Sequence, residues 1–307
     1  MNPCIRGVVR AATQEELEVV GIRRGYAGLI EQDIQPMDAS SVSGIICQGG
    51  TILKTARSDY FMQQEGQRKA VDNIRKMGID ALVVIGGDGS FKGAKMLDEV
   101  WGVPTVGIPA TIDNDIWGTD FTIGFMSAVN TALEAIDKIR DTATSHNRLF
   151  LIEVMGRTSG FIALWAGVAG GAEDIVIPEI PTNLDSICAK LEEGRRRGKT
   201  SSIMVVAEGD EAGNAFEIAS KIEQTIHYEV RVAVLGHMQR GGAPGVWDRI
   251  LGMKLGKGAV DVICEGKRNV MVGLVNGKIK VSPIEDSWKR KKEIDLELYR
   301  LNQIMAT

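Results

Sequence analysis

Residues 81–90 read ALVVIGGDGS, an apolar run that ends in a Gly-Gly-Asp-Gly turn. The run is rich in β-branched residues, which indicates a buried strand, and a helical pattern begins near Lys92. A strand, a glycine-rich turn and a helix in succession are typical of open α/β sheets. In such sheets, ligands lie outside the carboxyl ends of the strands. The stretch therefore predicts both the fold class and the place where functional residues gather.

Similar apolar runs recur along the chain and alternate with helical patterns. Around SAVNTALEAIDKI, for example, Met126, Val129, Leu133 and Ile136 form one apolar stripe. The runs LVVIGGDG and IMVVAEGD both end in glycine and acid, which indicates two similar α/β domains. The other expected strands are residues 103–109, 148–156, 174–179, 201–209 and 230–237.

The composition is that of a soluble globular protein. Of the 307 residues, 44% are hydrophobic and 25% are charged, which excludes disordered and fibrous classes and allows two domains. A formal net charge of −4 gives no reason to expect nucleic acid or a membrane surface as a partner. No stretch approaches the ~20 apolar residues of a membrane span, and MNPCIRGVVRAA has arginines where a signal peptide is apolar. We therefore expect a cytoplasmic protein that acts on small molecules or proteins.

The cysteines Cys4, Cys47, Cys188 and Cys264 are far apart and show no C-x-x-C spacing. This pattern predicts single buried thiols in a reducing compartment and does not favour a zinc site.

The stretch GIPATIDND, residues 107–115, ends a second predicted strand with Thr111, Asp113 and Asp115 at alternate positions. In an extended backbone, residues two apart point to the same side, so these polar groups would converge. Two adjacent carboxylates repel each other and need a cation or a shared proton. The stretch indicates either a metal or acid/base site, or a turn in which each Asp caps backbone N–H groups.

The GGDGS turn, residues 86–90, has the properties of a phosphate site. Glycines let the backbone approach a phosphate, and the N-terminus of the following helix offers unpaired N–H groups. Asp88 is placed to hold a Mg²⁺ that neutralises phosphate charge. The alternative is a plain strand-to-helix turn.

Three further polar groups follow predicted strands. Arg157, in EVMGRTSG, would stabilise a transferring phosphoryl group or else pair with a surface carboxylate. His237 and Arg240, with Arg231 at the beginning of the preceding strand, indicate an anion clamp, although a single His is more often structural. Glu208 would accept a hydrogen bond from a sugar hydroxyl or cap its turn. Together these parts describe phosphoryl transfer.

Five motifs, in their order and spacing, resemble the bacterial ATP-dependent type of 6-phosphofructokinase: GGDGS, TIDNDIWGTDFTIGF, EVMGR, AEG and LGHMQRGG. The match covers nearly the whole chain. It implies a glycolytic enzyme that phosphorylates fructose 6-phosphate with Mg²⁺ and ATP, and a homotetramer. It also implies two similar three-layer α/β domains with mainly parallel sheets and the active site in the cleft between them. The nucleotide-binding domain would be residues 1–124 plus 239–289, and the sugar-phosphate-binding domain residues 125–238 plus 290–307.

The resemblance also implies roles for the site residues. Asp113 would be the base that accepts the proton of the sugar 1-hydroxyl, and Asp88 and Asp115 would serve Mg²⁺. The rest of the catalytic set would be Thr111, Asp115 and Arg157. Nucleotide would bind at Arg57, Gly87, Asp88, Gly89 and Ser90. Fructose 6-phosphate would contact Met155, Gly156, Arg157, Glu208, His237 and Arg240, with Arg148 and Arg231 supplied by a neighbouring subunit.

A regulatory site for ADP or phosphoenolpyruvate between subunits is implied as well. One arginine position of that site falls on Ala39, which predicts weakened or altered regulation. Without the resemblance, the GRRRGK run would be interpreted as a solvated basic turn. The matching positions are Arg6, Arg10, Arg140, Gly171, Glu173, Arg197 and Lys199.

Side-chain size at Gly89 and Ala110 bears on the phosphate donor. Relatives that use pyrophosphate tend to carry Asp and Lys at these two positions. An Asp would repel or crowd the α-phosphate of a nucleotide, and a Lys would bind pyrophosphate in its place. The small residues of this chain therefore favour ATP. The alternatives are a pyrophosphate-dependent enzyme and, from another class, an inactive or regulatory subunit.

The resemblance implies one further strand. Family members open with a strand and a GGD-x-PG turn just before the residues that match Met1 and Asn2. A sheet that lacks this strand would expose unpaired backbone and apolar surface, because parallel sheets are buried on both faces.

Overall fold

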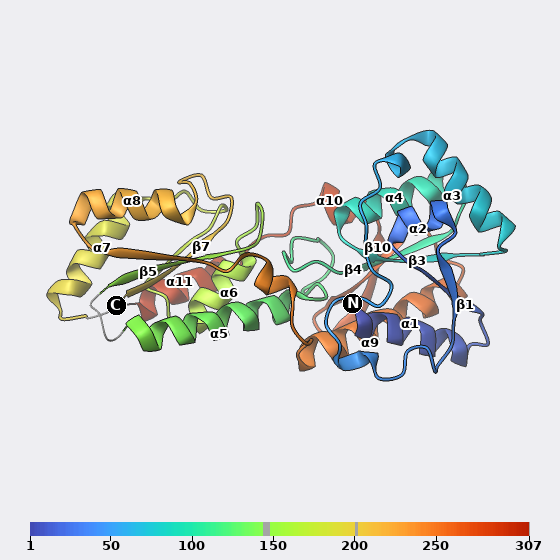
Figure 1. Ribbon diagram of the computed structural model, residues 1–307, viewed down its shortest axis with the longest axis horizontal. Coiled ribbons are helices and arrows are strands. Elements are labelled where there is room, and N and C mark those ends of the chain that lie inside the picture. The colour runs from blue at the N-terminus through green and yellow to red at the C-terminus, as the bar shows by residue number, and fades with distance from the viewer. Residues whose placement is uncertain (144–147, 200–201, 307) are drawn as a thin grey trace. The chain divides into compact units, whose positions relative to one another are not determined.

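The computed structural model describes residues 1–143, 148–199 and 202–306, which form two compact units (Figure 1). Unit 1 comprises Met1–Thr111, Ile116–Gly124 and Ala243–Lys292. Unit 2 comprises Ile112–Asp115, Phe125–Gly242 and Glu293–Thr307. The expected domain limits differ from this division in three places, because residues 112–115 and 239–242 belong to unit 2 and residues 290–292 to unit 1.

Unit 1 is built on a four-stranded sheet of order β10-β9-β4-β3. Strands β3 (Leu82–Gly86), β4 (Thr105–Pro109) and β9 (Val270–Val275) are parallel, and β10 (Lys278–Pro283) is antiparallel to β9. A separate antiparallel ribbon joins β1 (Val19–Ile22) to β2 (Ile34–Met37). The helices of this unit are α1 (Asn2–Gln14), α2 (Gly25–Glu31), α3 (Gln64–Lys76), α4 (Asp88–Glu99), α9 (Val246–Cys264) and α10 (Asp286–Lys289), with 3₁₀ turns η1 (Ile45–Cys47) and η2 (Tyr60–Met62).

Helices α1 and α9 pack together on one face of this sheet with their backbones almost in contact. A Cβ at Gly7 would lie 2.9 Å from Met253 Cα, and one at Gly256 would lie 2.7 Å from the Cys4 carbonyl oxygen. Such a close approach requires glycine. Burial between the helices and β4 raises the pKa of the Cys4 thiol to about 12.

All four cysteines are free, but the expectation that all are buried is wrong. Cys4 and Cys188 are buried, whereas Cys47 and Cys264 are exposed. The two exposed thiols lie at the ends of η1 and α9, where the chain turns out to solvent.

Strand β3 is the edge of the unit 1 sheet. Within the described residues, β4 is its only partner strand. The side chains of Val83, Val84 and Ile85 are only half-buried, although the strand is apolar throughout.

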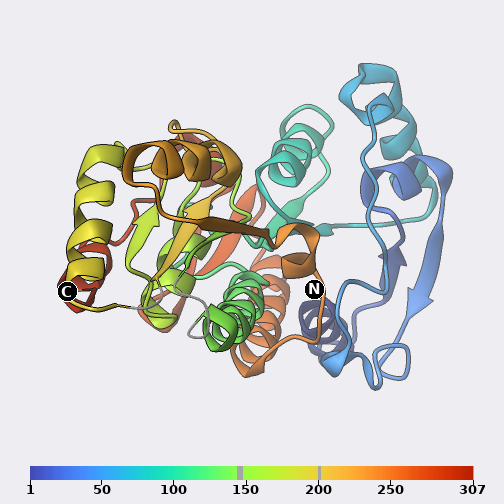
Figure 2. The same ribbon diagram turned by 60° about the vertical axis from the view of Figure 1, so that its left-hand side comes forward.

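Unit 2 contains a parallel four-stranded sheet of order β6-β7-β5-β8. Helices α7 and α8 cover one face, and α5 and α6 cover the other (Figures 1 and 2). The strands are β5 (Leu149–Val154), β6 (Asp174–Val176), β7 (Ser202–Ala207) and β8 (Val230–Val234). The helices are α5 (Phe125–Ala143), α6 (Phe161–Ala169), α7 (Leu184–Arg196), α8 (Ala215–Ile226) and α11 (Leu296–Met305), with the 3₁₀ turn η3 (Gly236–Arg240).

The six strands predicted from the sequence are all present, and the predicted fold class is confirmed. Each is shorter than its apolar run. Five of the strands end before the run does, whereas β4 begins two residues after the start of its run and reaches its last residue, Pro109. Strands β1, β2, β9 and β10 were not predicted.

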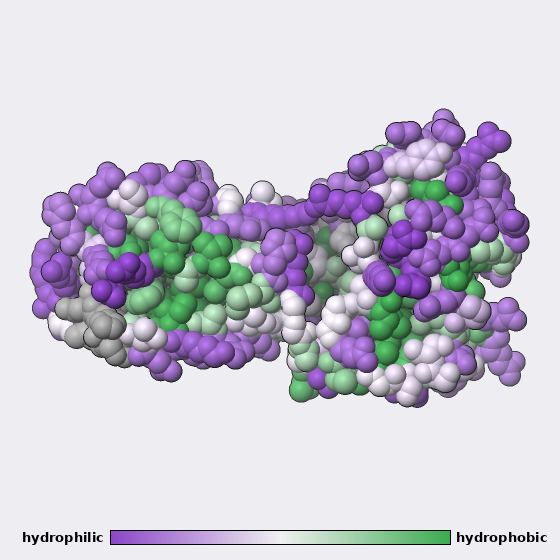
Figure 3. All heavy atoms as spheres, viewed as in Figure 1, coloured by the Kyte–Doolittle hydropathy of each residue, from purple (hydrophilic) through white to green (hydrophobic). Residues whose placement is uncertain are grey.

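Polar residues cover much of the visible surface, while apolar residues gather on unit 2 along the edge strand β8 (Figure 3). Val234 of this strand is 49% exposed and Met238, just beyond it, is 64% exposed. None of the helices in the described ranges is long and apolar enough to cross a membrane.

Candidate phosphoryl-transfer site

The GGDGS turn joins the end of β3 to the N-terminus of α4. Gly87 is the N-cap residue in an extended conformation, and Asp88 is the first residue of the helix. A Cβ at Gly86 would lie 2.5 Å from Ser90 Oγ, so the turn closes only with glycine there. The hydroxyl of half-buried Tyr26 donates to the Ser90 carbonyl oxygen at 2.6 Å and fixes the first turn of the helix. A rigid turn that opens a helix provides the backbone N–H groups that bind phosphate.

Asp88 is the carboxylate of this turn, with 47% of its side chain exposed. Its Oδ1 accepts from the Gly89 amide at 2.6 Å, and its Oδ2 pairs with Lys92 at 3.1 Å. Mg²⁺ in phosphoryl-transfer sites is held by one or two carboxylates together with phosphate and water. An accessible single carboxylate fits that ion. The described part of the chain has no group of three or more His, Cys, Asp or Glu placed for a metal, so phosphate and water would complete the coordination.

Gly89 and Ala110 flank the turn. A Cβ built at Gly89 meets no atom within 4 Å, so the space beside the first helical turn is open. The Ala110 amide donates to the Gly86 carbonyl oxygen at 2.9 Å and holds the end of β4 against that of β3.

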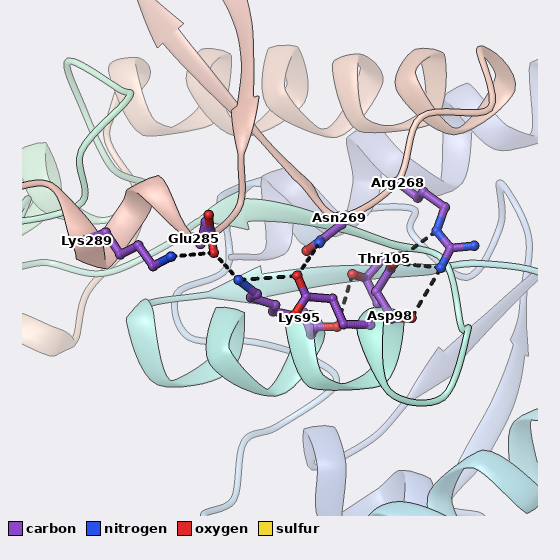
Figure 4. Close-up of polar contacts among 9 residues, drawn as sticks. Lys95, Asp98, Thr105, Arg268, Asn269, Glu285 and Lys289 are labelled. Carbon is purple, nitrogen blue, oxygen red and sulfur yellow. Dashed lines mark hydrogen bonds and ion pairs between the residues drawn. The ribbon is translucent and has the colours of Figure 1, made fainter.

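Helix α4 is anchored far from its N-terminus by charged groups (Figure 4). Buried Asp98 accepts from Arg268 at 2.8 Å and from the Thr105 amide at 3.2 Å. Lys95 pairs with Glu285, which also pairs with Lys289 at 2.8 Å. These hydrogen bonds lower the pKa of Glu285 to about 2. The anchor fixes α4, and with it the phosphate turn, to β4 and to the chain around β10.

The TIDND loop leaves β4 in a different conformation from the one expected. The strand ends at Pro109, and Asn114 is left-handed with a φ of 54°. The prediction that an extended backbone aligns Thr111, Asp113 and Asp115 is therefore wrong. Asp113 is 8% exposed, whereas Asp115 is exposed, so the two carboxylates lie in different surroundings. The Asp113 carbonyl oxygen accepts from Ser159 Oγ at 2.8 Å, which ties the loop to unit 2.

The half-buried Glu208, at the end of β7, holds the turn that follows β5. Its Oε1 accepts from the amides of Gly156 at 3.2 Å and Arg157 at 2.9 Å. A Cβ at Gly156 would lie 2.1 Å from the Ser159 carbonyl oxygen. Arg157 is exposed and left-handed, with a φ of 56°, a conformation that costs energy for a residue other than glycine. Glu208 therefore caps this turn with one oxygen, while its other oxygen makes no hydrogen bond to a described residue.

The turn also depends on Gln239, which the sequence analysis missed. Gln239 is 1% exposed in η3, and its side-chain oxygen accepts from the Met155 amide at 3.3 Å. It lies between His237 and Arg240, whose side chains are exposed. Its position within the QRGG motif was the one available signal.

The two arginines implied from a neighbouring subunit lie together in unit 2. Arg148 precedes β5 and Arg231 lies in β8, and both pair with Glu229. Arg57 lies in an exposed loop of unit 1.

The expected regulatory residues fall in both units. In unit 2, Arg140 donates to the carbonyl oxygens of Gly170 and Gly171, and Lys199 pairs with Glu173 at 2.6 Å. Arg197 instead pairs with Glu193 at 3.0 Å. In unit 1, half-buried Arg6 donates to the Val42 carbonyl oxygen, and Arg10 is exposed. Ala39 follows Asp38, and hydrogen bonds from Ser41 and Ser40 lower the pKa of the Asp38 carboxyl.

The glycine-rich GGDGS turn of unit 1, and Asp113, Glu208 and Arg157 of unit 2, are of the residue types that phosphoryl transfer uses. The chain belongs to the phosphofructokinase family, whose sequence model, described as phosphofructokinase, matches residues 1–263. The family expected from the motifs is thereby confirmed.

The relatives and solved structures that resemble this chain are also named as phosphofructokinases. ATP-dependent 6-phosphofructokinase 1 of Thermus thermophilus is 53% identical over 306 residues, which cover 100% of this chain and 95% of that protein. The ATP-dependent 6-phosphofructokinase of Halalkalibacterium halodurans is 54% identical with the same coverage. The crystal structure of Pichia pastoris phosphofructokinase in the T-state matches 100% of this chain, with a TM-score of 0.90 and 34% identity, although this chain spans only 38% of that one. A pyrophosphate-dependent phosphofructokinase from Marinobacter aquaeolei shares the fold, with a TM-score of 0.82 at 23% identity over 99% of this chain and 87% of that chain.

Proposed function

We propose that this protein phosphorylates fructose 6-phosphate to fructose 1,6-bisphosphate with Mg-ATP, a step of glycolysis. The observation that carries this proposal is the similarity, at 53% identity over the full chain, to a protein named ATP-dependent 6-phosphofructokinase. The GGDGS and TIDND stretches supply the chemical groups that such a reaction needs.

In this reaction the 1-hydroxyl oxygen of the sugar forms a bond to the γ-phosphorus of ATP. The bond from that phosphorus to the β,γ-bridging oxygen breaks, and ADP leaves. Asp113, which is 8% exposed, accepts the hydroxyl proton. Arg157 supplies positive charge to the transferring group, and Thr111 orients the reacting groups. Mg²⁺, held by Asp88 and Asp115, would neutralise charge on the phosphates when bound.

Replacing the proposed base tests this mechanism. Asp113→Asn keeps the shape of the side chain but removes its basicity, so kcat should fall by about 10²–10⁴-fold while the KM for fructose 6-phosphate changes little. The measurement is steady-state kinetics on a variant whose thermal unfolding matches that of the parent. Near-normal turnover would rule out Asp113 as the base.

ATP is the proposed donor, and pyrophosphate is the alternative. The open space beside Gly89 and the small side chain of Ala110 leave room for a nucleotide, and the relatives at 53% and 54% identity are named ATP-dependent. Turnover of fructose 6-phosphate with each donor in turn decides between the two. Faster turnover with pyrophosphate would overturn the assignment.

We propose that the enzyme is a cytoplasmic homotetramer regulated by ADP or phosphoenolpyruvate. The exposed apolar surface along β8 supports subunit association, since such patches mark interaction sites. The Arg140, Glu173 and Lys199 group is the proposed effector-binding part of unit 2. Ala39 in place of an arginine should weaken regulation. Light scattering gives the oligomeric state, and strong ADP activation with sigmoidal kinetics would contradict the weakened response.

A further inference from the structure

A single carboxylate joins the two arginines of unit 2 at the amino ends of neighbouring strands. Arg148 Nε donates to Glu229 Oε2 at 3.0 Å, and Arg231 Nη2 donates to Glu229 Oε1 at 2.5 Å. Each oxygen of the Glu229 carboxylate therefore accepts a hydrogen bond from one guanidinium group. Two like charges are held close together by one opposite charge.

The backbone fixes this arrangement. Strands β5 and β8 are parallel neighbours, and the Leu149 amide donates to the Glu229 carbonyl oxygen at 3.2 Å. In the same register Phe150 lies opposite Arg231. Arg231 thus lies within the sheet, and Arg148 and Glu229 immediately precede the first paired residues, Leu149 and Val230.

The ion pairs leave hydrogen-bond donors of both arginines available. Arg148 uses only its Nε, and Arg231 uses only one terminal nitrogen. Toward the residues that the structure describes, the other guanidinium nitrogens make no hydrogen bond. The arginine side chains are 30% and 55% exposed, so these donors face accessible space. Paired guanidinium groups with free N–H donors bind phosphate dianions well.

We propose that Glu229 is a positioning residue for the phosphate group of fructose 6-phosphate, holding Arg148 and Arg231 together so that their remaining donors meet the phosphate oxygens. This inference rests on the proposed function and on the role that the family resemblance implies for these two arginines, binding of the sugar phosphate. The hydrogen bond from Arg148 lowers the pKa of Glu229, so the carboxylate stays ionised during turnover. Without it, the guanidinium groups would repel each other and lose their fixed geometry.

The first test compares Glu229→Gln with Glu134→Gln. Glu134 is a matched control, because it is an exposed glutamate of unit 2 that pairs with Lys138 on α5. We expect Glu229→Gln to raise the KM for fructose 6-phosphate about fivefold, the size of a partly exposed ion pair, while kcat and the KM for ATP stay unchanged. Glu229→Asp, which keeps the charge, should recover part of the loss. Thermal unfolding of each variant confirms that it is folded.

The second test separates this inference from the function on which it rests. Arg148→Ala and Arg231→Ala should each raise the KM for fructose 6-phosphate about tenfold or more, since each removes a hydrogen bond between charged groups. If both arginine variants raise it and Glu229→Gln does not, the positioning role is wrong and the arginine assignment stands. If neither arginine variant raises it, the arginine assignment fails and the positioning role falls with it. A lower KM in Glu229→Gln would mean that Glu229 competes with phosphate and would also overturn the proposal.

Discussion

The two glycine turns of the molecule differ in what holds them. In unit 2, the Met155–Arg157 turn is fixed by Glu208 from the next strand and by the buried Gln239. In unit 1, Asp88 of the GGDGS turn is accessible and, among the described residues, is paired only along its own helix, with Gly89 and Lys92. The Met155–Arg157 turn is thus held without a ligand, whereas the Asp88 carboxylate is accessible for the metal ion that we propose it binds. Changes in the first should therefore affect stability and activity together, and changes in the second should affect nucleotide use alone.

The largest effect is expected from Gly156→Ala. The added Cβ would lie 2.1 Å from the Ser159 carbonyl oxygen at a φ of 157°, so the turn must shift. We expect a loss of about 3 kcal/mol in the free energy of unfolding, measured in urea, and a large fall in kcat/KM for fructose 6-phosphate. Gly241→Ala is the control, since its nearest contact is an ordinary 3.6 Å. If Gly156→Ala and Gly241→Ala had the same free energy of unfolding, the close contact at Gly156 would not be what holds the turn at residues 155–157.

A smaller and more selective effect is expected from Gly89→Asp. The new side chain enters open space, so the free energy of unfolding should change by less than about 0.5 kcal/mol. Its charge would repel the ATP phosphates and raise the KM for ATP about tenfold, with little change for fructose 6-phosphate. Gly89→Asn has the same size without the charge. If Gly89→Asn raised the KM for ATP as much, crowding and not charge would be the cause.

The smallest effect concerns the anchor of α4. The folded-state pKa of Glu285 is about 2, below its ordinary 4.5, so its pairs with Lys95 and Lys289 stabilise the fold above pH 4.5. That contribution is lost as the pH falls from about 4.5 toward about 2. Glu285→Gln should therefore narrow the gap between the urea midpoints measured near neutral pH and near pH 3. An unchanged gap would show that the pairs are fully screened by solvent.

Features that appear as local sequence patterns could be predicted, whereas contacts between residues far apart in the sequence could not. Strands β3 to β8 were predicted because each is an apolar run ended by a turn. The β9–β10 hairpin was missed although Asn276 and Gly277, with φ values of 49° and 76°, form a typical hairpin turn sequence.

The sequence predictions for the candidate site failed in two ways. The TIDND carboxylates were placed by assuming an extended backbone, and the left-handed Asn114 breaks that assumption. Glu229 and Gln239 were missed because their partners, Arg148 and Met155, are 81 and 84 residues away in the sequence. Spacing along the chain carries no signal for contacts of that kind.

The close packing of α1 on α9 has a consequence for the order of synthesis. The strands of unit 2 lie in one continuous stretch, residues 149–234, so that sheet can form as soon as this stretch leaves the ribosome. Unit 1 is discontinuous, and the Gly7 face of α1 can pack on α9 only after Met253 has been synthesised. Until then the face of α1 that carries Gly7 has no partner helix, whereas Ile5 and Val9 can already pack against Met37, Val42 and Ile45. The helix is thus buried in two stages, an early one by the segment that follows it and a late one by α9.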